Sequence, residues 1–86
     1  MVPSRSDIVR EVTDFLVTTF KIAPGDRVFT PNVNLFDEGY VDSTGLVDLI
    51  AFIETTYGMA LERRHFSSAE FTTIHGIARM IRATVA

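Results

Sequence analysis

The 86-residue sequence predicts an all-α fold, a small bundle of three main helices plus one short helix, with a long loop between helices one and two. Three segments repeat apolar residues at the helical period of about 3.6. The one candidate strand, Arg27–Thr30, has no second strand to pair with. Hydrophobic residues make up 47% of the chain and charged residues 22%, which suits a folded core, so we expect residues 1–86 to form a single domain.

The first helix is expected to begin at Ser4 or Ser6, because either hydroxyl can cap free backbone N–H groups. An apolar stripe with helical spacing follows, and Pro24-Gly25 ends the pattern with a strong turn signal. The stripe consists of Ile8, Val12, Phe15, Leu16 and Thr19, and Val9 and Phe20 lie beside it.

A long connection runs from about Ile22 to Asp42 and contains many Pro, Gly and Asn residues. Loops of this length in a compact domain are usually functional or are packed by their own side chains. We therefore expect the apolar residues of the loop to tuck beneath it, namely Val28, Phe29, Val33, Leu35 and Phe36.

The second helix is expected to start at Asp42 or Ser43 and to end at Gly58, which suits a left-handed C-cap. Val47 and Ala51 lie off its apolar stripe and face away from the core. The stripe is the most regular in the chain and comprises Leu46, Leu49, Ile50, Ile53 and Tyr57.

Two shorter features complete the bundle. The segment Ser67–Phe71 has room for about one helical turn, with Ser67 as a possible cap. Thr72 or Thr73 can cap a last helix. The apolar face of that helix is formed by Ile74, Ile77, Ala78 and Ile81.

The composition argues against several classes of function and location, namely nucleic-acid binding, secretion, membrane spanning and metal binding. A net charge of −3 argues against a nucleic-acid partner. Cysteine is absent and no secretory signal is recognisable, so we expect a cytoplasmic protein. No run of about 18 apolar residues predicts a membrane span. His65 and His75 lack further ligands at workable spacing, so we expect no metal site and interpret both as surface or capping residues.

The acidic residues are unevenly distributed. Between Asp37 and Tyr57 the sequence has no Lys or Arg, whereas arginines predominate after Leu61. The acids of the first segment are Asp37, Glu38, Asp42, Asp48 and Glu54. One face should therefore present an acidic field to its partners, unless this is only a solvated helix face.

Ser43 lies where the long loop meets the second helix. Backbone N–H groups without intrahelical partners point toward such a position, and the helix macrodipole favours a phosphate there. Serine is also a common structural cap at this place. The free N–H groups and the dipole of the helix N-terminus therefore do not by themselves distinguish a plain N-cap from a modification site.

Three ordered stretches resemble the acyl and peptidyl carrier proteins. Residues 34–50, NLFDEGYVDSTGLVDLI, resemble the family's "L-F-x-x-G-x-x-D-S" loop and the helix after it. Residues 53–59, IETTYGM, are similar to the exit of that helix, and residues 70–78, EFTTIHGIA, to the start of the last helix. The resemblance spans about Ile8 to Ile81 and implies a carrier protein that catalyses nothing itself.

The resemblance also implies residue roles. Ser43 would be the attachment site of 4'-phosphopantetheine, supplied from coenzyme A by a phosphopantetheinyl transferase, and Asp42 would be the adjacent acid that the transferase recognises. An adenylating acyl or aminoacyl ligase, or an acyltransferase, would load the cargo as a thioester, and downstream thioester-using enzymes would receive it. The partner-facing residues would be Thr44, Val47, Asp48, Ala51 and Glu54.

The sequence departs from the fatty-acid carriers at several positions. Thr44-Gly45 stand where those carriers usually have a Leu after the serine, and Thr55-Thr56 replace acids. Stand-alone aminoacyl, D-alanyl and peptidyl carriers are more similar. The expected setting is therefore specialised-metabolite biosynthesis of the nonribosomal peptide or polyketide type, or aminoacyl transfer. The alternative is a helical protein–protein interaction domain without a cofactor.

Overall fold

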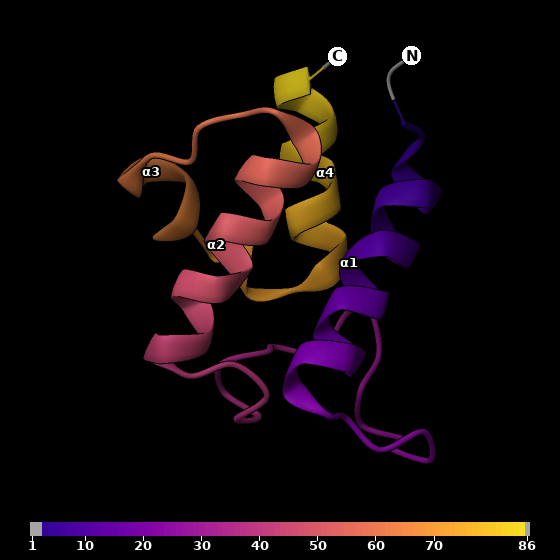
Figure 1. The fold of residues 1–86 in the computed structure, drawn as a ribbon. Coiled ribbons are helices and arrows are strands. Elements are labelled where there is room, and N and C mark those ends of the chain that lie inside the picture. Colours follow the sequence, from indigo (N-terminus) through magenta and orange to yellow (C-terminus); the bar gives the residue numbers. More distant parts are fainter. Residues whose placement is uncertain (1–2, 86) are drawn as a thin grey trace.

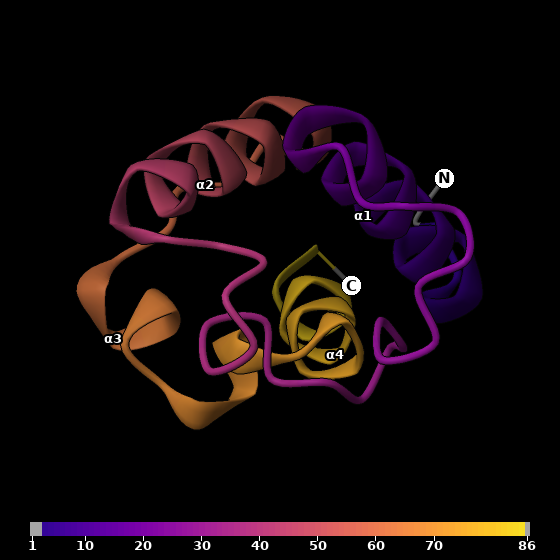
Figure 2. The ribbon, with the colours of Figure 1, turned by 90° about the horizontal axis from the view of Figure 1, so that it is seen from below.

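The computed structural model of the protein describes residues 3–85 (Figure 1). Its elements are the helices α1 (Arg5–Phe20), α2 (Ser43–Tyr57), α3 (Arg63–Phe66) and α4 (Ile74–Val85), and the 3-10 turn η1 (Ala69–Thr72). No strand occurs in this part of the chain, and the predicted all-helical fold is confirmed. Figure 2 shows α4 enclosed by the other helices and by the long loop.

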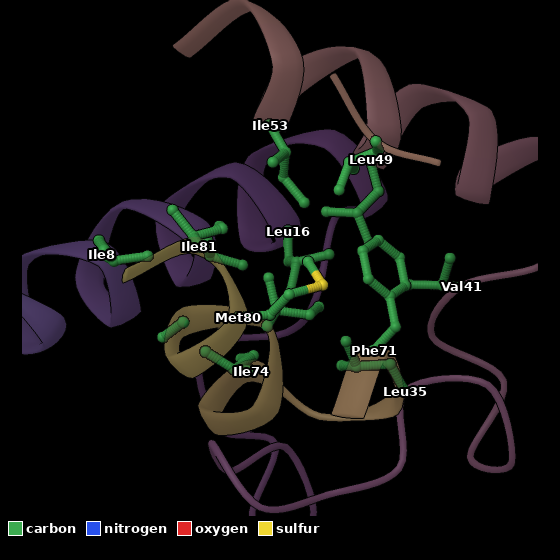
Figure 3. Packing of buried hydrophobic residues seen from close by; sticks show 14 of the residues in the cluster. Ile8, Leu16, Leu35, Val41, Leu49, Ile53, Phe71, Ile74, Met80 and Ile81 are labelled. Carbon is green, nitrogen blue, oxygen red and sulfur yellow. The ribbon is translucent and has the colours of Figure 1, made fainter. Parts of the chain in front are cut away.

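The core is apolar, and α4 supplies much of it. Among the described residues no polar or charged side chain is buried as a whole. Phe71 of η1 is the largest fully buried side chain, and Figure 3 shows it beside Val41 and pointing toward Leu49 of α2. Residues from the loop, η1 and three helices therefore share one hydrophobic centre.

Helix α1 begins and packs largely as predicted. Ser4, the first of the two predicted caps, accepts a hydrogen bond from the Asp7 N–H at 3.1 Å. Three members of the predicted stripe are fully buried, whereas Phe15 is half-buried. Thr19 is exposed, so its assignment to the core stripe was wrong. The buried members are Ile8, Val12 and Leu16.

The long connection is a loop, as predicted, and most of its apolar residues pack beneath it. Leu35 is fully buried, and Phe29, Val33 and Phe36 pack partly against the core. Val28 is the exception, because 54% of it is exposed. It lies in a tight turn in which the Asp26 carboxylate accepts the Val28 and Phe29 N–H groups, and this turn lies at the surface.

The segment after α2 contains a helix that periodicity does not predict. Helix α3 has only four residues, and its start is closed by the Glu62 N–H donating to Nδ1 of His65 at 2.9 Å. His65 is thus a capping residue, as predicted. The predicted turn at Ser67–Phe71 forms as η1 two residues later, with Ser68 rather than Ser67 at its N-cap position.

Helix α4 carries the predicted apolar face. All four of its predicted core residues are fully buried, and Met80 joins them. Thr73, one of the two proposed caps, accepts a hydrogen bond from the Gly76 N–H at 3.0 Å. At the end of α2, Gly58 adopts the predicted left-handed conformation with φ of 63°.

Candidate functional site at the start of α2

Ser43 is the first residue of α2, and Asp42 rather than Ser43 caps the helix. The Asp42 carboxylate accepts a hydrogen bond from the Gly45 N–H at 2.7 Å. Ser43 is exposed, and no partner for its hydroxyl is found among residues 3–85. Because Asp42 performs the structural role, the Ser43 hydroxyl is left free at the surface.

The residues before Asp42 form a compact turn. Asn34 Oδ1 accepts hydrogen bonds from the N–H groups of Phe36 and Asp37 at 3.0 and 2.9 Å. The Leu35 carbonyl oxygen then accepts the N–H groups of both Tyr40 and Val41. Gly39 completes the turn at φ of 78°, a conformation that L side chains rarely adopt.

Two buried side chains attach this turn to the core. Leu35 is fully buried and Val41 is 2% exposed, so both ends of the turn are held by apolar contacts. The Leu35 N–H also donates to the Thr72 carbonyl oxygen of η1 at 2.8 Å. Ser43 is therefore presented by a fixed loop and not by a loose one.

A side-chain hydrogen bond also joins the two ends of the long loop, at Asp26 and Tyr40. The Tyr40 hydroxyl donates to Asp26 Oδ2 at 2.8 Å, and the rings of Tyr40 and Phe29 meet edge to face. This hydrogen bond, together with those from the backbone, holds the pKa of the Asp26 carboxyl below its usual value. Desolvation, followed by the hydrogen bond and charge of Asp26, raises the pKa of Tyr40 to about 12.

Gly45 allows a close approach of α2 to the Phe20 ring at the end of α1. A Cβ atom at this position would lie 2.6 Å from Cε1 of Phe20, closer than carbon atoms normally approach. In the sequence Gly45 stands out only as a departure from the fatty-acid carriers. The structure gives its physical reason, which is the packing of the Phe20 ring against the first turn of α2.

The residues present fit a phosphodiester at Ser43. Helix geometry leaves the N–H groups of Ser43 and Thr44 without intrahelical acceptors, and the positive end of the helix dipole lies there. The site is exposed, so an attached chain would not have to displace core side chains. A phosphate on the Ser43 oxygen would thus meet favourable electrostatics without a steric cost.

The other predicted site residues lie along α2 but differ in their contacts. Thr44, Asp48 and Ala51 are exposed, and Val47 is 66% exposed. Glu54 is half-buried, and its Oε2 accepts a hydrogen bond from the Leu61 N–H at 2.8 Å. Glu54 therefore has a structural role in fixing the segment after α2, which its charge in the sequence does not indicate.

Residues 10–81 match the protein family described as the phosphopantetheine attachment site, and the chain belongs to this family. Members of this family bear 4'-phosphopantetheine covalently, so residues 10–81 form a carrier-protein domain.

The chain is also similar in sequence to a curated carrier protein. Over 51 residues the chain is 31% identical to a D-alanyl carrier protein of Bacillus velezensis. This stretch covers 59% of the chain and 65% of that relative, so the match spans less than two thirds of the relative's length. No solved structure matches the chain significantly.

Two further findings bear on the site. Within residues 3–85, no group of three or more His, Asp or Glu side chains is arranged to hold a metal ion. No helix in the same range is both long and apolar enough to cross a bilayer.

Proposed function

We propose that Ser43 is the attachment residue and that the protein presents an acyl or aminoacyl cargo to partner enzymes. The observation that carries the proposal is the division of roles at the start of α2, where Asp42 caps the helix and Ser43 remains exposed and free. In the transfer the Ser43 oxygen would form a bond to the diphosphate phosphorus of coenzyme A that bears the pantetheine, and the bond from this phosphorus to the bridging oxygen would break. Adenosine 3',5'-bisphosphate would leave, and the transferase would take the hydroxyl proton.

When bound, phosphopantetheine supplies a terminal thiol, which this cysteine-free chain lacks, and that thiol holds the cargo as a thioester. The protein's own residues position the attachment point. The turn at residues 34–41, closed by Asn34 and Leu35, fixes where Ser43 stands. A transferase would then recognise the exposed first turn of α2, including Asp42 and Thr44.

Mass spectrometry tests the attachment directly. The wild-type protein, incubated with coenzyme A, Mg²⁺ and a promiscuous phosphopantetheinyl transferase, is expected to gain the mass of one phosphopantetheine group. Ser43→Ala should gain none, because it lacks the accepting oxygen. Ser67→Ala, an exposed serine outside the site, is the matched control and should react as the wild type does. An unmodified wild type would overturn the proposal and favour an interaction domain without a cofactor.

We further propose that the cargo is aminoacyl or peptidyl, in specialised-metabolite biosynthesis or aminoacyl transfer, and that an adenylating ligase loads it. The support is the Thr44-Gly45 pair after the serine and the likeness to a carrier named for its D-alanyl cargo. Incubation of the holo-protein with candidate ligases and amino acids, followed by mass measurement, checks the cargo class.

Partner docking is expected to depend on the charge of α2. Asp48 is exposed, and no basic residue lies between Asp37 and Tyr57. Asp48→Lys should therefore slow modification by the transferase several-fold at low ionic strength, and salt should diminish the difference. Glu54 is a poor probe, because its reversal would also remove the hydrogen bond to Leu61. Equal rates for Asp48→Lys and wild type at low salt would contradict the expectation.

A further inference from the structure

A shallow groove, here called the α1–α2 groove, runs between these two helices along the side of the bundle. One hollow in it has a volume of about 430 Å³. A second overlaps the first at Phe15, Thr19, Phe52 and Thr56 and extends the groove to Asp48 and Ala51. The functional assignment of Ser43 makes no use of this groove.

The floor of the groove is aromatic and preformed. The rings of Phe15 and Phe52 stack with their centroids 4.2 Å apart, and both are half-buried. Phe20 meets Phe15 edge to face at one end of the row, and Tyr57 meets Phe52 at the other. The Tyr57 hydroxyl donates to Glu11 Oε1 and ties α2 to α1. The pKa of Tyr57 is raised mainly by burial and, to a smaller extent, by this hydrogen bond to Glu11.

The described residues that line the groove include acids but no basic residue. Glu11 and Asp14 contribute from α1, and Asp48 contributes from α2. None of the three forms an ion pair within residues 3–85, whose ion pairs join Arg10 with Asp7, Arg64 with Glu62 and Arg79 with Glu70. Glu11 accepts the Tyr57 hydroxyl, whereas no cation or hydrogen-bond donor within residues 3–85 pairs with the Asp14 or Asp48 carboxylate. An apolar floor beside these two carboxylates suits a small group that is partly apolar and positively charged.

The groove can be reached from Ser43 along one exposed side of α2. Ser43, Val47 and Ala51 are exposed and follow one another at intervals of four residues. The last of them lines the groove. At 1.5 Å per residue, the eight residues from Ser43 to Ala51 correspond to about 12 Å along the helix. A flexible chain attached to Ser43 could therefore place its far end in the groove.

We propose that the α1–α2 groove receives the aminoacyl end of the cargo, with the ammonium group near Asp14 and Asp48 and the side chain against Phe15 and Phe52. The proposal rests on attachment at Ser43. An acyl cargo without the ammonium group would lose the charge complementarity and would occupy the groove less. The groove thus favours an aminoacyl over a neutral acyl group as the class of cargo.

The test compares two cargoes that differ in one amino group. A promiscuous transferase loads the protein with alanyl or propionyl pantetheine from coenzyme A analogues in which an amide replaces the labile thioester. Mass spectrometry confirms loading, and ¹H–¹⁵N spectra report on the groove. The alanyl form should shift the Phe52, Thr55 and Thr56 amides at least twofold more than the propionyl form, and 0.5 M salt should reduce the difference.

Two variants test the acids. Asp14→Asn should reduce the alanyl-specific shifts at least twofold, and it lies on α1 away from the proposed partner face. Asp37→Asn, an exposed acid in the loop before α2, is the matched control and should leave them unchanged. Equal shifts for both cargoes, or shifts confined to Ser43 and Val47 in a protein of the loaded mass, would overturn the groove proposal. Failure of the protein to gain mass would instead overturn attachment.

Discussion

Gly76→Ala is expected to lower the free energy of unfolding by about 3 kcal/mol, the upper end of the usual cost of overpacking. A Cβ atom on Gly76 would overlap the carbonyl oxygen of Glu70 and lie 2.8 Å from its carbonyl carbon. Both atoms belong to the backbone, so η1 as a whole would have to move. A domain of 86 residues has only about 4–13 kcal/mol of stability, and the loss would leave it close to unfolding.

The expected loss of stability is opposite in sign to the usual effect of replacing glycine by alanine in a helix. In an ordinary helix interior, alanine is more favourable than glycine by about 1 kcal/mol. Urea denaturation followed by circular dichroism measures the change in stability. Gly25→Ala is the matched control, since no atom lies within 4 Å of its built Cβ, and it should change stability by about 0.5 kcal/mol or less. An unchanged urea midpoint for Gly76→Ala would show that η1 does not pack as described.

Phe71→Ala is expected to cost about 3–5 kcal/mol, the usual range for removing a buried aromatic ring. Phe71 is fully buried although its element is a four-residue 3-10 turn. Its ring lies beside Val41, which immediately precedes the Asp42-Ser43 pair (Figure 3). Loss of the ring should therefore loosen the modification site as well as the core.

Two measurements separate these effects. The urea midpoint should fall strongly for Phe71→Ala and less for Phe71→Leu, which keeps most of the apolar volume. Val28→Ala, at a residue 54% exposed, should stay near the wild type. Amide hydrogen exchange at Tyr40 and Val41 should be faster in Phe71→Ala, because both amides donate to the Leu35 carbonyl oxygen. Loss of less than 1 kcal/mol would contradict the central position of the ring.

The two residues connect the core to the site. Gly76 lets η1 pack closely on α4, and η1 supplies both the Phe71 ring and the Thr72 carbonyl oxygen that holds Leu35. Leu35 in turn closes the turn that leads to Ser43. The stability of the C-terminal part of the chain therefore determines how firmly the start of α2 is presented.

The regular helices could be predicted from the sequence because burial on one side imposes a period of 3.6 residues. Leu49 and Ile53 in α2, and Ile74 and Ile81 in α4, are buried as their spacing indicates. Thr19 keeps the spacing of α1, but near the end of the helix no core residue covers it and it lies exposed along the α1–α2 groove. Helix α3 has no periodicity at all, since four residues are too few to repeat.

At the functional site, the sequence by itself determined the family and the candidate serine, because the order of Gly39, Asp42 and Ser43 within longer matching stretches is specific. Only the tertiary structure decided which of Asp42 and Ser43 caps α2, since both residue types can accept the same N–H. It also revealed the second role of Glu54 and the α1–α2 groove. The groove depends on contacts between residues distant in sequence, such as Phe15 with Phe52, and local patterns carry no information on such contacts. The Glu54 bond spans only seven residues, but it closes the irregular segment after α2, which helical periodicity does not describe.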